Sequence, residues 1–155
     1  MYQGFEPVFF NDSRILILGS FPSVKSREVQ FYYGNKNNRF WGLLSEFFNE
    51  HAGDTAEEKI KFLKKHKIAL WDIVMSCEIE GSKDEKISDY TVAELEIVTN
   101  VAPVQKIICN GKKSYDIFAR HYGGLSLPSV CLPSTSPRNF YFDKQKWFKE
   151  LSLLK

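Results

Sequence analysis

The sequence predicts an α/β fold, a three-layer α/β/α sandwich with a central four-stranded, mostly parallel sheet. The first observation is a set of four apolar, β-rich runs at residues 14–19, 68–74, 105–109 and 128–132. Their hydrophobicity is nearly continuous, as expected for parallel strands that are covered on both faces. The second observation is that helical patterns separate these runs, which indicates right-handed βαβ connections. At 155 residues, with 43% hydrophobic and 26% charged residues, the chain suits a single domain over residues 1–155.

The first strand, residues 14–19, is followed by a long polar segment at residues 20–38 and then by the first two predicted helices. Residues 39–50 form a helix with one apolar face, made of Phe40, Leu43, Leu44, Phe47 and Phe48. The helix at residues 55–66 begins with Thr55 and Glu58, which have the spacing of a capping box.

The later elements follow the same alternation. After the strand at residues 68–74 and a polar loop at residues 77–90, Thr91 and Glu94 repeat the capping-box spacing and predict a helix over 91–100. Helices at residues 111–122 and 143–154 flank the last strand, 128–132. Loops as long as 20–38 and 77–90 are usually functional or mobile in a compact domain.

Two loops rich in small residues and proline each follow a predicted strand. Residues 19–23 read Gly-Ser-Phe-Pro-Ser, and residues 133–139 read Pro-Ser-Thr-Ser-Pro-Arg-Asn. An open α/β sheet binds its ligand at the carboxyl ends of its strands. We therefore expect these loops to form two walls of one cleft.

Positive charge is concentrated near those loops, although the net charge is only +2. Residues 25–39, 106–120 and 138–155 are rich in lysine and arginine, whereas acids gather at 46–58 and 78–96. A small net charge argues against a bulk polyanion-binding protein, but this distribution suits a cleft that faces phosphate. A mixed, solvated surface remains the alternative.

Several classes of site are excluded by missing motifs. The three cysteines, Cys77, Cys109 and Cys131, form no Cys-x-x-Cys pair, so we expect buried cytosolic thiols and no metal site. The chain has neither a phosphate-binding glycine loop nor a Gly-x-Gly-x-x-Gly motif, so we expect no nucleotide cofactor. Gly-x-Ser-x-Gly is absent and the three histidines are predicted on helices or their ends, which disfavours a Ser-His-Asp hydrolase. No signal peptide or membrane-length apolar run is present, which predicts a soluble cytoplasmic protein.

The residues of the loops suit recognition of a flat, polar base. Hydroxyl groups come from Ser20, Ser23, Ser26, Ser134, Thr135 and Ser136, and amides that can hold a water come from Asn35, Asn37 and Asn38. Aromatic side chains that can stack on a base are Phe21, Phe31, Tyr32 and Tyr33. Each hydroxyl taken alone is also explained by a role in its own turn.

Three segments resemble the uracil-DNA glycosylase superfamily, and within it the hypoxanthine (deoxyinosine) DNA glycosylases. Residues 19–23 resemble the superfamily's first motif, Gly-x-x-Pro-Gly/Tyr, and residues 133–139 resemble its second motif. Residues 33–41, Tyr-Gly-Asn-Lys-Asn-Asn-Arg-Phe-Trp, resemble a block of the hypoxanthine branch. Shorter matches at residues 70–72 and 110–113 extend the similarity over nearly the whole chain.

The resemblance implies a monofunctional DNA glycosylase of base excision repair that flips a deaminated base out of DNA and leaves an abasic site. It implies that Asn38 orients the attacking water and that Asp72 occupies the position of a base-recognising residue, with a structural cap or pairing as the alternative role of Asp72. Arg138 falls where relatives insert a wedge into the duplex, with a phosphate clamp as the alternative role. We further expect the base to contact Phe21, Ser20 and Asn110, and the DNA to contact Ser23, Ser134, Ser136 and Asn139.

Two departures from the superfamily pattern keep other functions open. Phe21 stands where many members have a water-polarising Asp or Asn, and Ser134 stands where relatives have His or Asn. The alternatives are a mismatch-type uracil or thymine glycosylase, a non-catalytic DNA-binding module, and a hydrolase of free nucleosides. The predicted partner is damaged DNA, single- or double-stranded, bound by a monomer without a membrane or a cofactor, as for a nucleoid-associated protein of a prokaryote.

Overall fold

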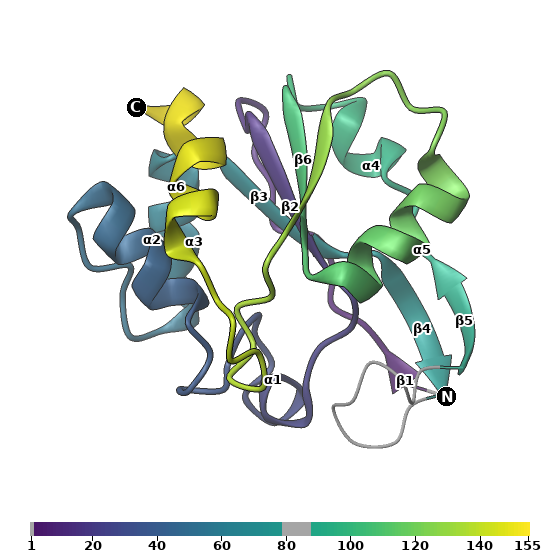
Figure 1. The fold of residues 1–155 in the computed structure, drawn as a ribbon, viewed down its shortest axis with the longest axis horizontal. Coiled ribbons are helices and arrows are strands. Elements are labelled where there is room, and N and C mark those ends of the chain that lie inside the picture. The colour runs from purple at the N-terminus through teal and green to yellow at the C-terminus, as the bar shows by residue number, and fades with distance from the viewer. Residues whose placement is uncertain (1, 79–87) are drawn as a thin grey trace.

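A computed structural model describes residues 2–78 and 88–155 and confirms the predicted α/β class. The central sheet has four parallel strands in the order β3-β2-β6-β7 (Figure 1). Their bounds are Ile15–Gly19 for β2, Ile68–Asp72 for β3, Lys106–Asn110 for β6 and Ser129–Leu132 for β7. Each end of these strands lies within about two residues of the predicted end. The agreement is close because continuous apolar runs mark strands that are covered on both faces.

Helices cover both faces of this sheet, as Figure 1 shows. On one face lie α2, α3 and α6, with bounds Phe40–Phe48, Ala56–Lys65 and Lys144–Leu151. On the other lie α4, Glu96–Thr99, and α5, Lys112–Tyr122. The capping box predicted at Thr55 and Glu58 is present at the start of α3, and α6 continues as a short 3-10 helix over Ser152–Leu154.

Two hydrophobic cores form because successive strand side chains point to opposite faces of the sheet. In β2, Leu16 and Leu18 join the core beneath α4 and α5, and Ile15 and Ile17 join the core beneath α2, α3 and α6. Each of these four side chains is completely buried. The sheet is therefore a rigid layer that fixes the positions of the loops at its edge.

A second, three-stranded sheet was not predicted from the sequence. Its order is β1-β4-β5, with bounds Tyr2–Gln3, Val74–Glu78 and Ser88–Val92. The predicted strand at 68–74 is split at Ile73, where the backbone N–H groups of Ile73 and Val74 donate to the carbonyls of Gly19 and Ser20. The chain then leaves the central sheet.

The helix predicted over residues 91–100 is wrong in its first half. Thr91 lies in β5 and its hydroxyl is hydrogen-bonded to that of Ser76 at 2.6 Å, so it is a cross-strand partner and not a helix cap. The short helix α4 begins five residues later. Local spacing suggested a cap there, but pairing with β4 determines the conformation.

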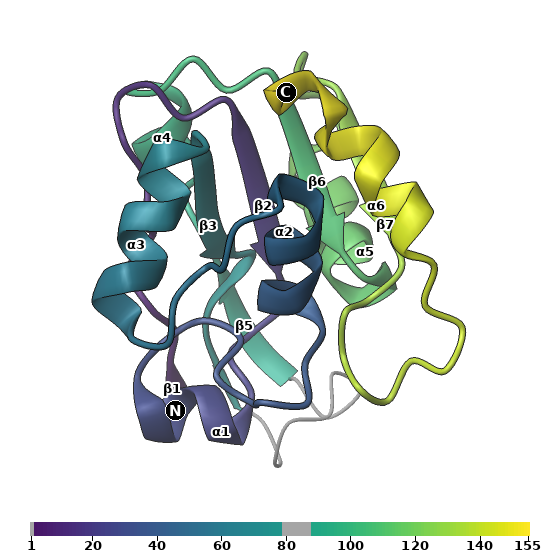
Figure 2. The ribbon, with the colours of Figure 1, turned by 90° about the vertical axis from the view of Figure 1, so that its left-hand side faces the viewer.

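Two other expectations need correction. The loop predicted at residues 20–38 contains a short helix, α1, over Val24–Val29 (Figure 2). The loop predicted at 77–90 includes the end of β4 and the start of β5, and residues 79–87 lie outside the described residues. Cys77 and Cys109 are buried as expected, but Cys131 is exposed because β7 lies at the edge of the sheet. No helix among the described residues is long and apolar enough to cross a membrane.

Candidate active site

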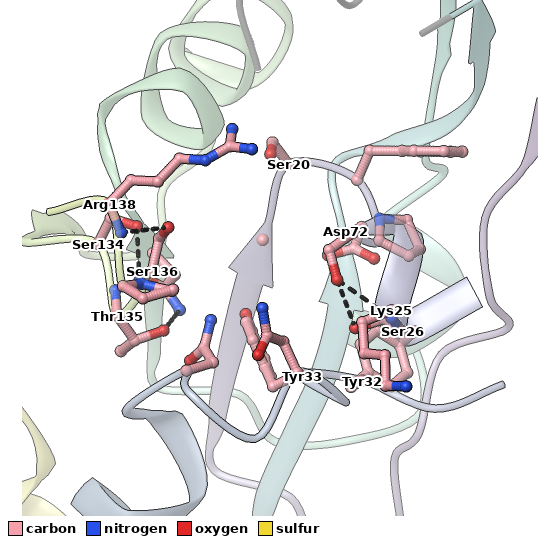
Figure 3. A pocket seen from close by; sticks show the side chains of 18 of the residues that line it. Ser20, Lys25, Ser26, Tyr32, Tyr33, Asp72, Ser134, Thr135, Ser136 and Arg138 are labelled. Atoms are coloured by element: carbon pink, nitrogen blue, oxygen red, sulfur yellow. Dashed lines mark hydrogen bonds between the residues drawn. The ribbon is translucent and has the colours of Figure 1, made fainter. Parts of the chain in front are cut away.

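A pocket of about 410 Å³ lies at the carboxyl ends of the central strands (Figure 3). Strand β2 pairs with β3 on one side and with β6 on the other, so the chain connections diverge here, at the position where open α/β sheets bind ligands. All ten residues predicted for the site line this pocket: Ser20, Phe21, Ser23, Asn38, Asp72, Asn110, Ser134, Ser136, Arg138 and Asn139. The two small-residue loops thus form opposite walls, as expected.

The floor of the pocket is formed by the ends of β2 and β3. Gly19 is the register partner of Asp72, whose side chain is 4% exposed. A Cβ atom on Gly19 would collide with Asp72 Oδ1 and would lie 3.1 Å from the hydroxyl of Tyr33. The absence of a side chain at Gly19 is therefore what allows the carboxylate and the phenol to approach the end of β2.

Neither Gly19 nor Tyr33 was predicted as a site residue, although Tyr33 was noted as an aromatic side chain able to stack on a base. Its ring stacks on Phe40 with centroids 4.0 Å apart, and its backbone has a φ of 52°, which is uncommon for a bulky residue. Such a conformation persists only where the surroundings hold it. The signal was present in the sequence, since Tyr33 begins the block that resembles the hypoxanthine branch.

Asn38 also lines the pocket and lies two residues before the start of α2. Its Oδ1 accepts a hydrogen bond of 2.9 Å from the backbone N–H of Phe40, and its own N–H donates to the Asn35 carbonyl at 2.9 Å. A carboxamide oxygen has two lone pairs, and the Nδ2 group has two hydrogens. One bond to the backbone therefore fixes the orientation of the amide and leaves it able to bind a water.

The loop at residues 133–139 is fastened to the sheet through Asn110, which ends β6. Asn110 Oδ1 accepts from the backbone N–H of Thr135, and Asn110 Nδ2 donates to Thr135 Oγ1, both at 3.0 Å. Both residues are buried. The predicted contact of Asn110 with a base thus competes with a structural role that the sequence did not reveal.

Arg39 joins the same loop to the segment that carries Asn38. Its backbone N–H donates to the Thr135 carbonyl at 3.0 Å, and its Nη1 donates to the Ser136 carbonyl at 2.8 Å. Asn38 and the second loop are therefore one connected unit. Arg39 and Ser136 were both within segments that the sequence singled out, but their pairing across 97 residues left no local signal.

The serine hydroxyls accept hydrogen bonds from nearby backbone N–H groups, which explains why these loops keep their shape. Ser134 Oγ accepts from Ser136, Ser136 Oγ accepts from Arg138, and Ser23 Oγ accepts from Ser26 as the cap of α1. The turn role considered for each hydroxyl is therefore present at Ser23, Ser134 and Ser136. A hydroxyl that accepts one bond keeps a further lone pair, so it can also contact a ligand.

The aromatic residues near the pocket divide into two groups. Phe21 is 8% exposed and lines the pocket. Tyr32 donates its hydroxyl to the Glu6 carbonyl at 2.7 Å, and Phe31 stacks on Trp41 rather than lining the pocket. Burial, with a smaller contribution from Asp72, raises the pKa of Tyr32 far above its ordinary value, so this phenol stays neutral. Phe31 does not line the pocket and is not available to stack on a bound base, whereas Tyr32 lines the pocket with 3% of its surface exposed.

Charge in the pocket is sparse. Among the described residues that line it, Asp72 is the only carboxylate and no histidine is present. Arg138 is exposed, and Figure 3 shows its side chain extending from the second loop in the direction of Ser20. Within residues 2–78 and 88–155, no three His, Cys, Asp or Glu side chains are grouped in a way that could hold a metal ion. The polar groups that line the pocket are amides, hydroxyls, the Asp72 carboxylate and the cations Lys25 and Arg138.

A three-layer α/β fold with a pocket at the switch point of its sheet belongs to the class of open α/β proteins that bind a ligand at the sheet edge. Comparison with known proteins makes this specific. The chain belongs to the uracil DNA glycosylase superfamily, whose family model matches residues 7–153.

Individual relatives agree with this assignment. The chain is 38% identical over 148 residues to a hypoxanthine DNA glycosylase of Methanosarcina acetivorans, covering 93% of this chain and 92% of that protein. It is 39% identical over 114 residues to a hypoxanthine DNA glycosylase of Methanosarcina barkeri, covering 72% of each. A solution NMR structure from Methanosarcina acetivorans, assigned provisionally as a uracil DNA glycosylase, matches with a TM-score of 0.86 and 34% identity, covering 98% of this chain and 97% of that one. The resemblance seen in the sequence is confirmed.

Proposed function

We propose that this protein is a monofunctional DNA glycosylase that removes hypoxanthine from DNA and leaves an abasic site. The observation that carries the proposal is the pocket at the end of β2, which Asn38 and Asp72 line together with the two loops. The two Methanosarcina relatives named as hypoxanthine DNA glycosylases support the choice of lesion.

The reaction hydrolyses the bond between N9 of the base and C1′ of deoxyribose. The target nucleotide leaves the base stack and enters the pocket, where Phe21, which lines it, would contact the base. The bond electrons go to the base, the sugar acquires oxocarbenium character, and a water oxygen bonds to C1′ while its proton is transferred to the departing base. In our proposal Asn38 holds that water in position, which lowers the barrier without a second carboxylate.

Asp72 would select the base through its hydrogen-bonding edge. Hypoxanthine carries a hydrogen on N1, which a carboxylate accepts, whereas N1 of adenine has a lone pair that a carboxylate repels. The burial of Asp72 at 4% exposure strengthens both effects, because water cannot screen them. A carboxylate does not stabilise an anionic leaving base, so Asp72 would contribute selectivity more than rate.

The direct test uses labelled oligonucleotides that carry hypoxanthine, xanthine, uracil or a mismatched thymine, followed by alkaline cleavage of abasic sites. We expect strand cleavage with hypoxanthine to exceed that with the other lesions. Faster release of uracil or of mismatched thymine would favour the mismatch-type alternative. No release from any substrate, together with binding to DNA, would contradict the proposal and favour a non-catalytic module.

Asp72→Asn tests base selection. An amide can donate as well as accept, so the variant should lose discrimination, and the ratio of hypoxanthine to adenine excision should fall roughly tenfold, which is about 1.4 kcal/mol. The matched control is Asp54→Asn, because the Asp54 side chain is 88% exposed and lies outside the pocket. An unchanged ratio in Asp72→Asn would remove this residue from base recognition.

A further inference from the structure

Asn38, to which we assign the attacking water, lies on the segment over residues 30–39 that connects α1 to α2. Two hydrogen bonds to Asn35 shape this connecting segment. The Asn37 backbone N–H donates to the Asn35 side-chain oxygen and the Asn38 backbone N–H donates to the Asn35 carbonyl, both at 2.9 Å. These local bonds do not determine where the segment lies relative to a base at the end of β2, so residues outside it must do so.

Ser26, on α1, holds the first half of the connecting segment. Its hydroxyl oxygen accepts from the Gly34 backbone N–H at 2.9 Å and from the Ser23 hydroxyl at 3.1 Å. Ser26 is 2% exposed, so water does not compete for these bonds. A Cβ atom on Gly34 would collide with Val29 and lie 3.2 Å from the Ser26 Cα, so the missing side chain permits this approach. The segment is thereby joined to the first pocket loop, residues 19–23.

Arg39 holds the other end, directly after Asn38. Its Nη1 donates to the Ser136 carbonyl at 2.8 Å and its backbone N–H donates to the Thr135 carbonyl at 3.0 Å. The guanidinium carbon also lies 5.1 Å from the centre of the Phe142 ring, which adds a cation–π contact. These bonds join the segment to the second pocket loop, residues 133–139. Asn38 is therefore held between the two loops that form the pocket walls.

We propose that Ser26 and Arg39 are positioning residues that set the place of the Asn38 amide, and hence of the attacking water, relative to the base. This inference rests on the proposed function, because it takes hydrolysis of the base–sugar bond as the reaction. The base would be located by the ends of β2 and β3, and the water by the connecting segment. The distance between them then depends on both positioning residues, and a misplacement of about 1 Å can slow a reaction about a hundredfold.

Arg39→Met tests the join to the second loop, because methionine is also a long side chain but cannot donate a hydrogen bond. The maximal single-turnover rate of hypoxanthine release should fall roughly tenfold, measured with saturating protein so that weaker DNA binding does not contribute. The matched control is Arg120→Met, which removes the same charge from an exposed arginine on α5 that is bonded to the Tyr90 hydroxyl. The control should keep the original rate. An unchanged rate in Arg39→Met would overturn the role of Arg39.

Ser26→Ala tests the join to the first loop. Its matched control is Ser45→Ala, because the Ser45 hydroxyl oxygen accepts from the Ala52 backbone N–H at 2.9 Å and Ser45 lies outside the pocket. Both variants lose a hydrogen bond from a backbone N–H to a serine, so both melting temperatures should fall. The maximal rate should fall roughly tenfold in Ser26→Ala alone. Equal rates in the two variants would remove Ser26 from the proposal.

A double-substitution cycle tests whether Arg39 acts through Asn38. In the Asn38→Ala background, Arg39→Met should lower the remaining rate by less than about twofold, because the amide that Arg39 positions is already absent. A role of Arg39 in stability alone would lower the rate by the same factor in both backgrounds. A roughly tenfold loss in each background would therefore contradict a positioning role.

NMR relaxation measures the position of the amide without reference to catalysis. The Asn38 side-chain amide signal is identified by its loss in Asn38→Ala. Its order parameter should fall in Arg39→Met and in Ser26→Ala, because the segment gains freedom of movement. The controls Arg120→Met and Ser45→Ala should leave it unchanged.

The order parameter and the excision assay separate the two proposals. An order parameter of the Asn38 amide that stays unchanged in both Arg39→Met and Ser26→Ala would overturn the positioning role. Failure of excision with every lesion would refute the proposed glycosylase activity, while the order parameter would still decide whether these two residues hold the amide.

Discussion

At the scale of single residues, the site depends on how closely Gly19, Asp72 and Tyr33 approach one another. Gly19 ends β2 next to Asp72, and its missing side chain gives space to the carboxylate and to the Tyr33 hydroxyl. The Tyr33 ring is held by its stack on Phe40, and the N–H of Phe40 also holds the Asn38 amide. The buried Phe40 therefore connects Tyr33, which lies next to Asp72, with Asn38, which would bind the water.

Gly19→Ala tests this close approach. The added Cβ would displace Asp72 Oδ1, so we expect the variant to fold with reduced stability and to lose most of its excision activity, by roughly a hundredfold or more. The measurement is single-turnover release of the base, with the melting temperature recorded alongside.

Gly42→Ala is the control for that substitution. Gly42 lies within α2 with no atom within 4 Å of the added Cβ, so the change should raise helix stability by about 0.5–1 kcal/mol and leave activity unchanged. Full activity in Gly19→Ala would show that the position of Asp72 is not important for the reaction.

At the scale of elements, the second pocket loop is held by side chains from two distant parts of the chain. Asn110 at the end of β6 makes two hydrogen bonds to Thr135, and Arg39 at the start of α2 makes two to the carbonyls of Thr135 and Ser136. Polar groups buried in this way are costly when a partner is removed. The loop is therefore a rigid wall, which suits a site that must place a water accurately.

Asn110→Ala should weaken that wall. It leaves the buried N–H of Thr135 without its partner, so the free energy of unfolding should fall by about 1–3 kcal/mol. Asn100→Ala, at an exposed asparagine after α4, should change it by less than about 0.5 kcal/mol. Urea denaturation measures both, and equal stability of the two variants would contradict the structural role assigned to Asn110.

The sequence predicted the central sheet and the site loops well, because both produce local signals. Continuous apolar runs mark buried parallel strands, and loops of small residues after them mark a sheet edge. The second sheet gave no such signal. The pairing of Thr91 with Ser76 depends on residues in different segments, and the spacing of Thr91 and Glu94 imitated a helix cap. The hydrogen bonds of Arg39 and Asn110 to the second loop could not be predicted either, because their donors and acceptors lie in segments far apart in the sequence.

At the scale of the whole molecule, every strand of the central sheet contributes to one pocket. Gly19, Asp72 and Asn110 end β2, β3 and β6, and the loop after β7 closes the far side. Sequence similarity spans the whole fold as well, since the superfamily model matches residues 7–153. The two cores on either side of the sheet keep these four chain segments in fixed relative positions.

Because the whole fold converges on this pocket, one substitution tests the account most directly. Asn38→Ala should reduce single-turnover release of hypoxanthine from a labelled oligonucleotide by at least about a hundredfold, since the attacking water loses its orienting amide. The affinity of this variant for a DNA duplex that carries an abasic-site analogue should stay within about twofold of that of the unsubstituted protein. Unchanged release of hypoxanthine by Asn38→Ala, with DNA binding intact, would contradict the mechanism proposed for this site.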